Sequence, residues 1–298
     1  MSPLAGPLAS SQTAQNPPNG AGLGALTPTK DKRLRKRLSG RQLDAIAGQL
    51  SGRDRRALEA VSRFGVMSGA QLQELLWAEV SPSARGRVAR RGLARLVRLD
   101  VLAPLARRVG GERAGSASTT FAVGRAGQYL LRSGRRVRAA RTPGARYLAH
   151  RLAVAQLYVE LVAAERQGLV ELARFEPEPE CWRPYMAGFG TRQTLKPDAF
   201  LVLATPSHEF AWLCEQDMAT EALSTIRGKA LRYHDYYRTG TEQAARGMFP
   251  RVLWIVPDAD RAEQIQYTLA GLPTDAKRLF AVCLQDEVVR HLVAETRR

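Results

Sequence analysis

The sequence predicts an α+β protein in which a helical N-terminal half precedes a mixed sheet flanked by helices. Apolar residues recur at helical spacing from Ser51 to about residue 100, whereas the second half alternates helical stretches with short apolar runs. The chain has 298 residues, of which 45% are hydrophobic. This length is enough for about two domains, and this composition is enough for a buried core.

The positive charge of the chain is confined to its first half. Residues 1–149 contain 27 Lys and Arg against 8 acids, and the remaining residues contain 18 basic and 20 acidic side chains. A general enrichment in arginine would affect both halves equally. The asymmetry indicates a nucleic-acid-binding module joined to a nearly neutral domain with another task.

Several protein classes are disfavoured by composition. No run approaches the roughly 18 apolar residues of a membrane span, and the N-terminus lacks the basic and apolar blocks of a secretory signal. The three cysteines, Cys181, Cys214 and Cys283, are scattered and odd in number, which argues against a disulfide framework or a zinc site. We therefore expect a cytoplasmic protein. The chain also lacks a glycine-rich phosphate loop after a strand, so an ATPase is disfavoured.

We predict four segments along the chain. Residues 1–40 are rich in Pro, Gly, Ala and Ser until the basic run of 30–41, and we expect a disordered tail with a basic end. The basic run is either a solvated helix start or an arm that lies on phosphates. Residues 41–134 form a first domain, and 135–145, basic and without apolar periodicity, form a linker. Residues 146–298 form a second domain.

The first domain begins with three predicted helices. They cover 51–68 with Ser51 as cap, 68–80 with Ser68 as cap, and a stretch that starts near Ser83. In the third helix the apolar residues turn one way and most arginines the other. Two strand-like stretches, 101–109 and 118–124, then enclose a glycine-rich tip, and another helix follows.

Three helices followed by a glycine-tipped hairpin resemble a winged helix-turn-helix along residues 51–132. The resemblance implies that the third helix enters the major groove of double-stranded DNA and that the hairpin contacts the backbone or minor groove. A docking role for another protein remains the alternative. The candidate DNA-binding residues are Arg85, Arg87, Arg90, Arg91, Arg95, Arg98, Arg107, Arg108 and Arg113.

The second domain is predicted to have the element order αβββαβαβ. Its elements are a helix over Arg146–Gly168, strands over 169–178, Thr194–Ala204 and Glu209–Asp217, a helix over 220–238, a strand over Arg251–Pro257, a helix over 258–272 and a strand over Arg278–Asp286. We expect a hairpin between the second and third strands. The alternation predicts a mixed sheet between layers of helices.

Three acids are predicted to meet at one end of this sheet. In "FAWLCEQDMAT", Glu215 and Asp217 are one residue apart, and the two-residue period of a strand puts both on one face. Asp198, in "KPDAF" on the preceding strand, can face Glu215 across the hairpin. Such a cluster needs a neutralising charge. Mg²⁺ or Mn²⁺ would supply it and would also activate water for phosphodiester cleavage.

The pattern "KPDAF…EQD" in an αβββαβ order resembles the PD-(D/E)XK nuclease superfamily. Pro197 and Asp198 match its first half and Glu215 its acid, whereas Asp217 stands where lysine is usual. The resemblance implies that Asp198 and Glu215 bind metal, near the backbone carbonyl of Gln216. It also implies that a lysine on the next helix, Lys229, orients the attacking water or offsets phosphate charge. The predicted catalytic residues are therefore Asp198, Glu215, Asp217 and Lys229, and Asp217 is either a further ligand or a helix cap in competition with Thr220.

A closer likeness covers residues 50–285. The helical first domain, "AHRLAVAQLYVEL", "PDAF", "EQDMAT" and "GKALRYHDYY", in this order, resemble the replication-relaxation family of plasmid proteins. The resemblance implies binding to a plasmid origin or similar site, with metal-dependent nicking or cleavage in replication or relaxation. The alternative is a non-catalytic replication accessory factor or transcriptional regulator. The sequence does not decide whether the protein forms a homodimer.

Other interpretations of the same residues also remain open. Glu215 could simply pair with Lys229 or Arg227 in an inactive scaffold. Tyr233 or Tyr237 could act as a covalent nucleophile, although both match the apolar side of their helix and the sequence lacks a His-X-His pair. Glu160 on the first helix of the domain could reach the acid cluster or could be an ordinary exposed acid.

Overall fold

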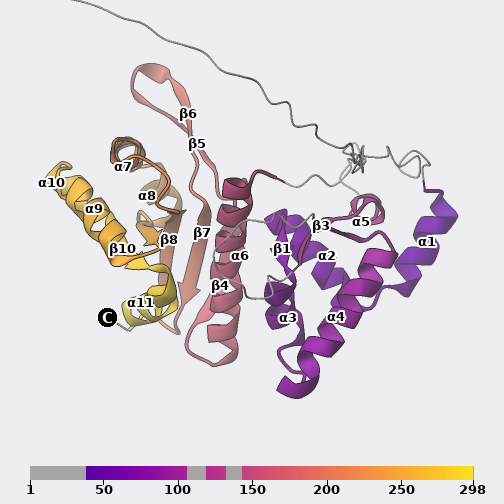
Figure 1. Ribbon diagram of the computed structural model, residues 1–298. Helices are drawn as coiled ribbons and strands as arrows, with labels where there is room; N and C mark the ends of the chain where they lie inside the picture. The colour runs from indigo at the N-terminus through magenta and orange to yellow at the C-terminus, as the bar shows by residue number, and fades with distance from the viewer. Residues whose placement is uncertain (1–37, 106–118, 132–142, 298) are drawn as a thin grey trace, which may run out of the picture. The chain divides into compact units, whose positions relative to one another are not determined.

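The computed structural model describes residues 38–105, 119–131 and 143–297, which belong to one compact unit (Figure 1). Most of the predicted tail, the predicted hairpin tip and most of the predicted linker lie outside these residues. Within them, the predicted α+β class and the mixed sheet flanked by helices are confirmed. No described helix is long and apolar enough to span a membrane.

Serine caps fix the start of three of the four N-terminal helices. They are α1 (Gly40–Gln49), α2 (Gly52–Phe64), α3 (Gly69–Trp77) and α4 (Pro82–Arg98), with the short strand β1 (Met67–Ser68) before α3. Ser39, Ser51 and Ser68 each form a capping box, in which the serine and the third helical residue satisfy each other's backbone amides. The caps predicted at Ser51 and Ser68 are confirmed, whereas α1 was not among the predicted helices.

A small antiparallel sheet contains β1 and two strands that follow α4. These strands are β2 (Leu102–Pro104) and β3 (Thr120–Val123), and the order β1-β3-β2 places β3 in the centre. The helix α5 (Arg125–Leu130) begins directly after Gly124. A Cβ atom at Gly124 would lie 2.3 Å from the backbone oxygen of Asp100, so only glycine allows the chain to pass this close to the start of β2.

The long helix α6 (Ala145–Arg166) packs against the N-terminal helices as well as the sheet. The ring of Tyr158 packs against Phe64 of α2, with ring centroids 5.2 Å apart, and the side-chain amide of Gln71 in α3 donates to the backbone oxygen of Leu152 at 2.7 Å. Leu157 and Leu161 lie in the same hydrophobic cluster as the N-terminal helices and one face of the large sheet. The helix is therefore buried on two sides.

The large sheet has five strands in the order β10-β9-β8-β7-β4. They are β4 (Glu171–Pro177), β7 (Ala199–Ala204), β8 (Glu209–Gln216), β9 (Arg251–Val256) and β10 (Phe280–Leu284). Strands β4, β7 and β8 pair antiparallel, whereas β8, β9 and β10 pair parallel. The expected hairpin between β7 and β8 is present.

Alternating side chains of the sheet enter two separate cores, one on each face. Residues such as Leu201 and Cys214 join α6 and α11 (Val288–Glu295), whereas Phe200 and Leu213 join α7 (Leu223–Arg238) and α9 (Ala259–Ala270). The sheet is thus covered by helices on both faces, as predicted.

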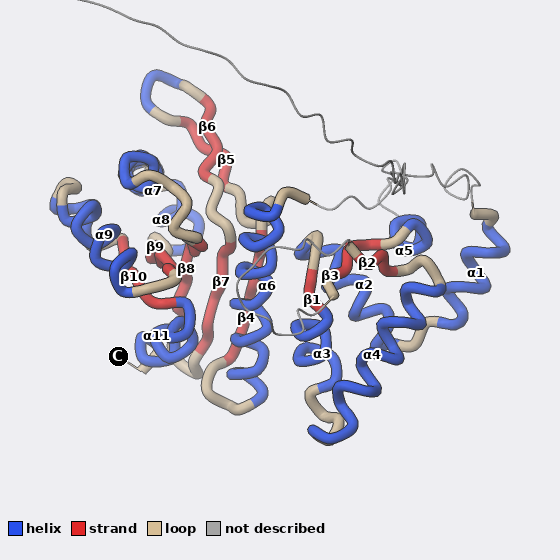
Figure 2. The backbone as a smooth tube through the Cα atoms, viewed as in Figure 1, coloured by secondary structure: helices blue, strands red, loops and turns tan. Residues whose placement is uncertain are grey.

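A second hairpin interrupts the predicted strand over 194–204. Strands β5 (Arg183–Met186) and β6 (Arg192–Leu195) pair antiparallel around a 3₁₀ turn at Gly188–Gly190, and β7 begins only at Ala199 (Figure 2). This break leaves Asp198 at the end of the sheet rather than inside a strand. The remaining short helices are α8 (Thr241–Arg246), α10 (Thr274–Lys277) and a 3₁₀ turn at Gln285–Glu287.

Candidate active site

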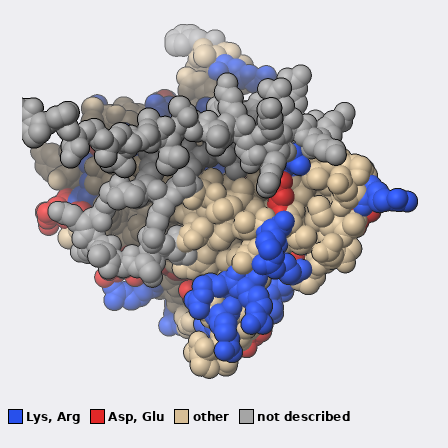
Figure 3. All heavy atoms as spheres, turned by 45° about the vertical axis from the view of Figure 1, so that its right-hand side comes forward, with Lys and Arg blue, Asp and Glu red and all other residues tan. Residues whose placement is uncertain are grey.

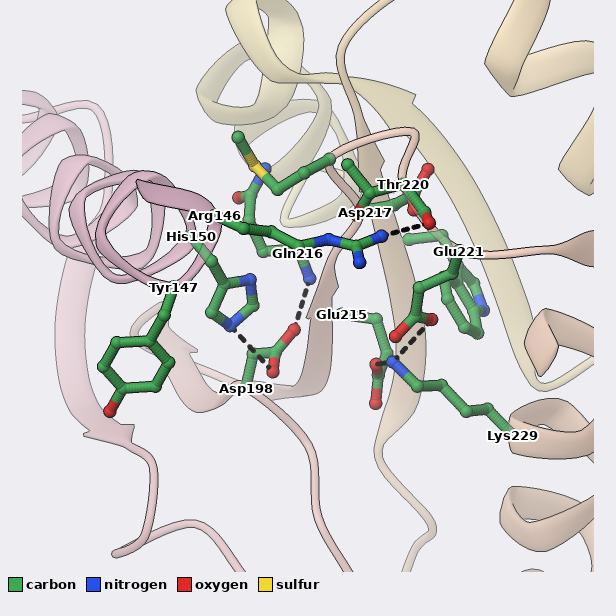
Figure 4. Close-up of a pocket in the computed structure, with 12 residues that line it drawn as sticks. Arg146, Tyr147, His150, Asp198, Glu215, Gln216, Asp217, Thr220, Glu221 and Lys229 are labelled. Atoms are coloured by element: carbon green, nitrogen blue, oxygen red, sulfur yellow. Dashed lines mark hydrogen bonds and ion pairs between the residues drawn. The ribbon is translucent and has the colours of Figure 1, made fainter. Parts of the chain in front are cut away.

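A cavity of about 290 Å³ lies where α6, β7, β8 and α7 meet (Figure 4). All four residues predicted to be catalytic from the sequence line it: Asp198, Glu215 and Asp217 supply three of its four acids, and Lys229 reaches it from α7. The cavity is lined by Arg146, Tyr147, His150, Asp198, Glu215, Gln216, Asp217, Met218, Thr220, Glu221, Lys229 and Trp254.

Asp198 occupies the position directly before β7. Its backbone amide donates to the carbonyl of Cys214 at 3.0 Å, which continues the β7–β8 ladder by one residue. The carboxylate in turn accepts the backbone amide of Gln216 at 2.8 Å, and the side chain is 14% exposed. Asp198 is therefore held beside Glu215 by backbone pairing, as predicted from the hairpin.

Glu215 is a buried carboxylate with two close donors and one repelling neighbour. The residue is 2% exposed; its Oε1 accepts the Tyr233 hydroxyl at 2.6 Å, and its Oε2 accepts the Lys229 ammonium at 3.0 Å. Burial and the negative charge of Asp198 raise the pKa of Glu215 to about 7, against the lowering effect of Lys229 and Tyr233. Further positive charge near this pair would be favourable.

Lys229 lies beside the acids, where the nuclease resemblance implies a lysine from this helix. Its Nζ lies 3.0 Å from carboxylate oxygens of both Glu215 and Glu221. Although burial lowers it, the charge of Glu215 and the bond to Glu221 raise the pKa of Lys229 above its ordinary value, so the ammonium stays charged. The alternatives on the same helix, Arg227 and Arg232, are exposed to solvent.

Asp217 is neutralised by a different residue. Strand β8 ends at Gln216, so Asp217 falls outside the alternation that predicted a shared face with Glu215. Both of its oxygens accept from Arg261, at 2.5 Å and 3.2 Å, and Arg261 also donates to the backbone oxygen of Glu221 at 2.8 Å. The helix α7 has Ala222 at its N-cap position, so neither Asp217 nor Thr220 caps it.

His150 is the main cavity residue that the sequence analysis missed. It extends from α6 to Asp198, with 3.2 Å between Nε2 and Oδ1 (Figure 4). Although burial lowers it, the carboxylate of Asp198 raises the pKa of His150 above its ordinary value. Glu160, the residue expected to reach the cluster from this helix, lies instead beside Gln156, at 3.0 Å. The helical register of Arg146, Tyr147 and His150 was the available signal.

The two candidate nucleophiles of α7, Tyr233 and Tyr237, pack against other aromatic side chains, as their position on the apolar side of the helix indicates. Tyr233 is 1% exposed, packs edge-on against Phe280 and donates its hydroxyl to Glu215. Burial raises the pKa of Tyr233 well above its ordinary value. Tyr237 packs edge-on against Phe249. A buried hydroxyl that is held by a carboxylate is poorly placed to attack a DNA backbone.

The cavity offers an oxygen donor pair for a divalent cation. Within the described residues, no group of three or more His, Cys, Asp or Glu side chains is arranged to hold a metal ion. Asp198 and Glu215 nevertheless face one cavity with room for several waters, and their mutual repulsion would be relieved by a cation. Mg²⁺ commonly binds through one or two carboxylates and completes its shell with water and phosphate oxygens, so these residues fit it.

The arginines of α4 divide into two groups. Arg87, Arg90, Arg91 and Arg98 are exposed, and Figure 3 shows basic side chains gathered on the face brought forward from the α4 side of Figure 1. Two other predicted DNA contacts have partners within the protein.

Arg85 donates to the backbone oxygens of Ala78 and Val80, and Arg95 pairs with the buried Asp54. These partners hold both guanidinium groups against the protein, and both residues are only partly exposed. Arg107, Arg108 and Arg113 lie outside the described residues.

Comparison with known proteins gives one match. A sequence model of the replication-relaxation family matches residues 58–252, a span that includes α4, the acids of the cavity and Lys229. No curated protein and no solved structure shows significant similarity to the chain.

Proposed function

Because the chain belongs to the replication-relaxation family, which indicates a role in the replication or relaxation of a plasmid or mobile element, we propose that it binds DNA and nicks it in a metal-dependent reaction. The observation that carries this proposal is the meeting of Asp198, Glu215 and Lys229 in one cavity. A pair of carboxylates with a lysine is the residue set of PD-(D/E)XK nucleases, and the element order of α6 to β9 supports that likeness.

The N-terminal region supports DNA binding. The order of helices and strands from α2 to β3, with β3 between β1 and β2, supports the likeness to a winged helix-turn-helix. In this fold α4 would enter the major groove, and its exposed arginines, Arg87, Arg90, Arg91 and Arg98, would contact DNA. The predicted contacts from Arg107, Arg108 and Arg113 remain part of the proposal.

Asp198 and Glu215 would hold Mg²⁺ or Mn²⁺, which would activate a water molecule and stabilise the charge of the phosphodiester as it is cleaved. The protein's own groups would prepare the site. His150 and the Gln216 amide fix the orientation of Asp198, and Lys229 holds Glu215 while its charge faces the cavity. An ammonium group has three donors, so Lys229 can contact a phosphate oxygen in addition to its two carboxylates.

In this proposal Asp217 has a structural role. Its bidentate pairing with Arg261 ties the segment after β8 to α9, and Arg261 holds the same segment again through the Glu221 carbonyl. This segment carries Met218, Thr220 and Glu221 into the cavity wall.

The test is nicking of a supercoiled plasmid with Mg²⁺ or Mn²⁺, compared with the same reaction in excess chelator. Asp198→Asn, Glu215→Gln and Lys229→Met should each reduce nicking by about 100-fold or more, because each removes electrostatic stabilisation of the transition state. Affinity for duplex DNA should change less than about twofold, since the α4 contacts remain.

Two matched controls accompany these variants. Glu209→Gln removes an exposed acid from the other end of β8, and Arg232→Met removes an exposed cation from α7. Both should nick like the wild type. Wild-type activity in the Asp198 and Glu215 variants would overturn the assignment of the site.

The alternative is a DNA-binding protein without nuclease activity. It is favoured by one observation: each oxygen of Glu215 and each oxygen of Asp198 already has a hydrogen-bonding partner in the protein. Wild-type protein that binds duplex DNA but leaves supercoiled plasmid intact with either cation would establish this alternative.

A further inference from the structure

Tyr147 places an exposed aromatic ring at the rim of the cavity. Its side chain projects from the first turn of α6, and 53% of its surface is exposed. Within the described residues, the other large apolar side chains with comparable exposure, such as Met186 and Tyr267, do not line this cavity. In Figure 4 the ring lies beyond His150 as seen from Asp198, on the same helix.

The ring is held in place from the protein side. The guanidinium group of Arg151, one turn further along α6, lies 5.9 Å from the centre of the Tyr147 ring. Arg151 is itself fixed, because it donates to the backbone oxygen of Phe64 at 2.8 Å and to the carboxylate of Glu178 at 2.7 Å. Because a fixed cation holds the ring from the protein side, the exposed face of the ring can stack against a planar group that approaches from the solvent.

Two further residues of α6 line the same cavity. Arg146 extends across the cavity rim, away from the ring, and donates to the backbone oxygen of Thr220, whereas His150 lies between the ring and Asp198 (Figure 4). Aromatic rings combined with cations along a groove are typical of proteins that bind single-stranded DNA, where bases stack and phosphates contact the cations.

We infer that Tyr147 stacks on a nucleobase next to the phosphate that enters the cavity, and that this nucleotide is unpaired when it binds. A base within a duplex exposes only its edges in the grooves, so its face becomes available to a ring only after it leaves the stack. The inference rests on the proposed function, since it names the form of DNA that this cavity receives.

The experiment compares single-stranded and duplex DNA of the same length as ligands for the full chain. Binding of a fluorescent oligothymidylate and of a mixed-sequence duplex is measured by anisotropy in chelator, so that cleavage plays no part. Tyr147→Ala should weaken single-strand binding about 10-fold, the range expected for one stacked base, and should leave duplex binding within about twofold. Tyr147→Phe, which keeps the ring, should bind like the wild type.

Two further variants make the result specific. Tyr267→Ala removes an even more exposed tyrosine, from α9, and should change neither affinity. Tyr147→Leu keeps apolar bulk without a flat ring; it should lose as much as Tyr147→Ala, and it serves the same comparison if the alanine variant folds poorly.

The inference is overturned if Tyr147→Leu binds single strands like the wild type, or if Tyr147→Phe loses as much as the non-aromatic variants, which would indicate a hydroxyl contact. An equal loss for duplex would also overturn it. Failure of plasmid nicking with intact single-strand stacking would instead contradict the proposed cleavage alone.

Discussion

Two buried carboxylates at the same end of β8 are neutralised in different ways. They belong to Glu215, near the end of the strand, and to Asp217, directly after it. Asp217 accepts two bonds from the single guanidinium of Arg261. Glu215 shares the ammonium of Lys229 with Glu221, and it lies close enough to Asp198 for the two charges to repel. The first arrangement is complete within the protein, whereas the second would be improved by a cation from outside.

This difference separates a structural charge from a candidate functional one. A buried ion pair with its donors satisfied is stable, but removal of one partner leaves the other as an unpaired buried charge. A buried acid that faces a second acid across a cavity carries a cost that the fold alone does not explain. The comparison therefore predicts opposite responses of the two acids to substitution.

The largest expected effect is a loss of stability when Asp217 loses its partner. Arg261→Met should lower the free energy of unfolding by about 3–5 kcal/mol, because the Asp217 carboxylate stays buried without a cation. Urea denaturation followed by circular dichroism measures this change. Arg290→Met is the matched control: its arginine is exposed on α11 and should matter by less than about 0.5 kcal/mol.

A second variant sharpens the interpretation of this loss. Asp217→Leu combined with Arg261→Met removes both charges and should recover part of the stability lost in the single variant. A small effect of Arg261→Met, similar to that of Arg290→Met, would mean that Asp217 finds another cation, and the structural role would then be wrong.

Glu215 should respond to pH in the opposite sense to an ordinary paired acid. Its pKa is raised from 4.5 to about 7, chiefly by burial and then by Asp198, so the folded protein binds more protons than the unfolded chain between these values. The contribution of Glu215 to stability is therefore full below pH 4.5 and is lost as the pH rises toward 7. In chelator, Glu215→Gln should remove this part of the pH dependence.

Thermal melting of both proteins from pH 5 to pH 7.5 measures the difference. Glu209→Gln, an exposed acid on the same strand, should keep the wild-type profile. Parallel profiles for the wild type and Glu215→Gln would show that Lys229 and Tyr233 neutralise Glu215 fully, and the contrast with Asp217 would disappear.

The parts of the site that follow from local periodicity could be predicted from the sequence. Strand pairing placed Asp198 beside Glu215, because a hairpin fixes the register of its two strands. Helix geometry puts Lys229 at the edge of an apolar stripe on α7, from which a long side chain reaches the acids. The stripe consists of Leu223, Ile226, Ala230, Tyr233 and Tyr237. Both inferences need only the spacing of residues within one or two neighbouring elements.

The partners that depend on tertiary packing could not be predicted in this way. Arg261 is 44 residues from Asp217 along the chain, and nothing in the spacing links them. His150 reaches Asp198 only because α6 packs against the sheet. The hairpin of β5 and β6 was missed for a local reason, since its strands have only four residues each and flank a glycine-rich turn without clear alternation.

The helix α6 shows a further limit of periodicity. In the sequence, one apolar stripe is formed by Leu148, Leu152, Ala155, Val159 and Val162. The helix nevertheless packs on the N-terminal helices as well as on the sheet, so apolar residues lie on more than one of its sides. A helix that is apolar on more than one side indicates burial without indicating its neighbours. The contact between Phe64 and Tyr158 therefore became known only from the structure.

The smallest expected effect concerns the arginines of α4, where a residue paired within the protein can again be compared with one that is not. Arg95 is paired with the buried Asp54, whose pKa is lowered overall because the Ser51 and Arg95 bonds outweigh the raising effect of burial. Arg91 is exposed. If the exposed arginines contact phosphates, Arg91→Ala should reduce the slope of log affinity against log salt concentration by about 1 and should leave the melting temperature unchanged.

Arg95→Ala should do the reverse. It removes a hydrogen bond from Asp54 and should lower the melting temperature, whereas the salt slope for duplex binding should stay close to the wild-type value. Titration of a labelled duplex at several salt concentrations, together with a melting curve for each variant, separates the two outcomes. A reduced salt slope for Arg95→Ala and an unchanged one for Arg91→Ala would mean that pairing within the protein does not distinguish structural arginines from DNA-binding ones, and α4 would then need another orientation on DNA.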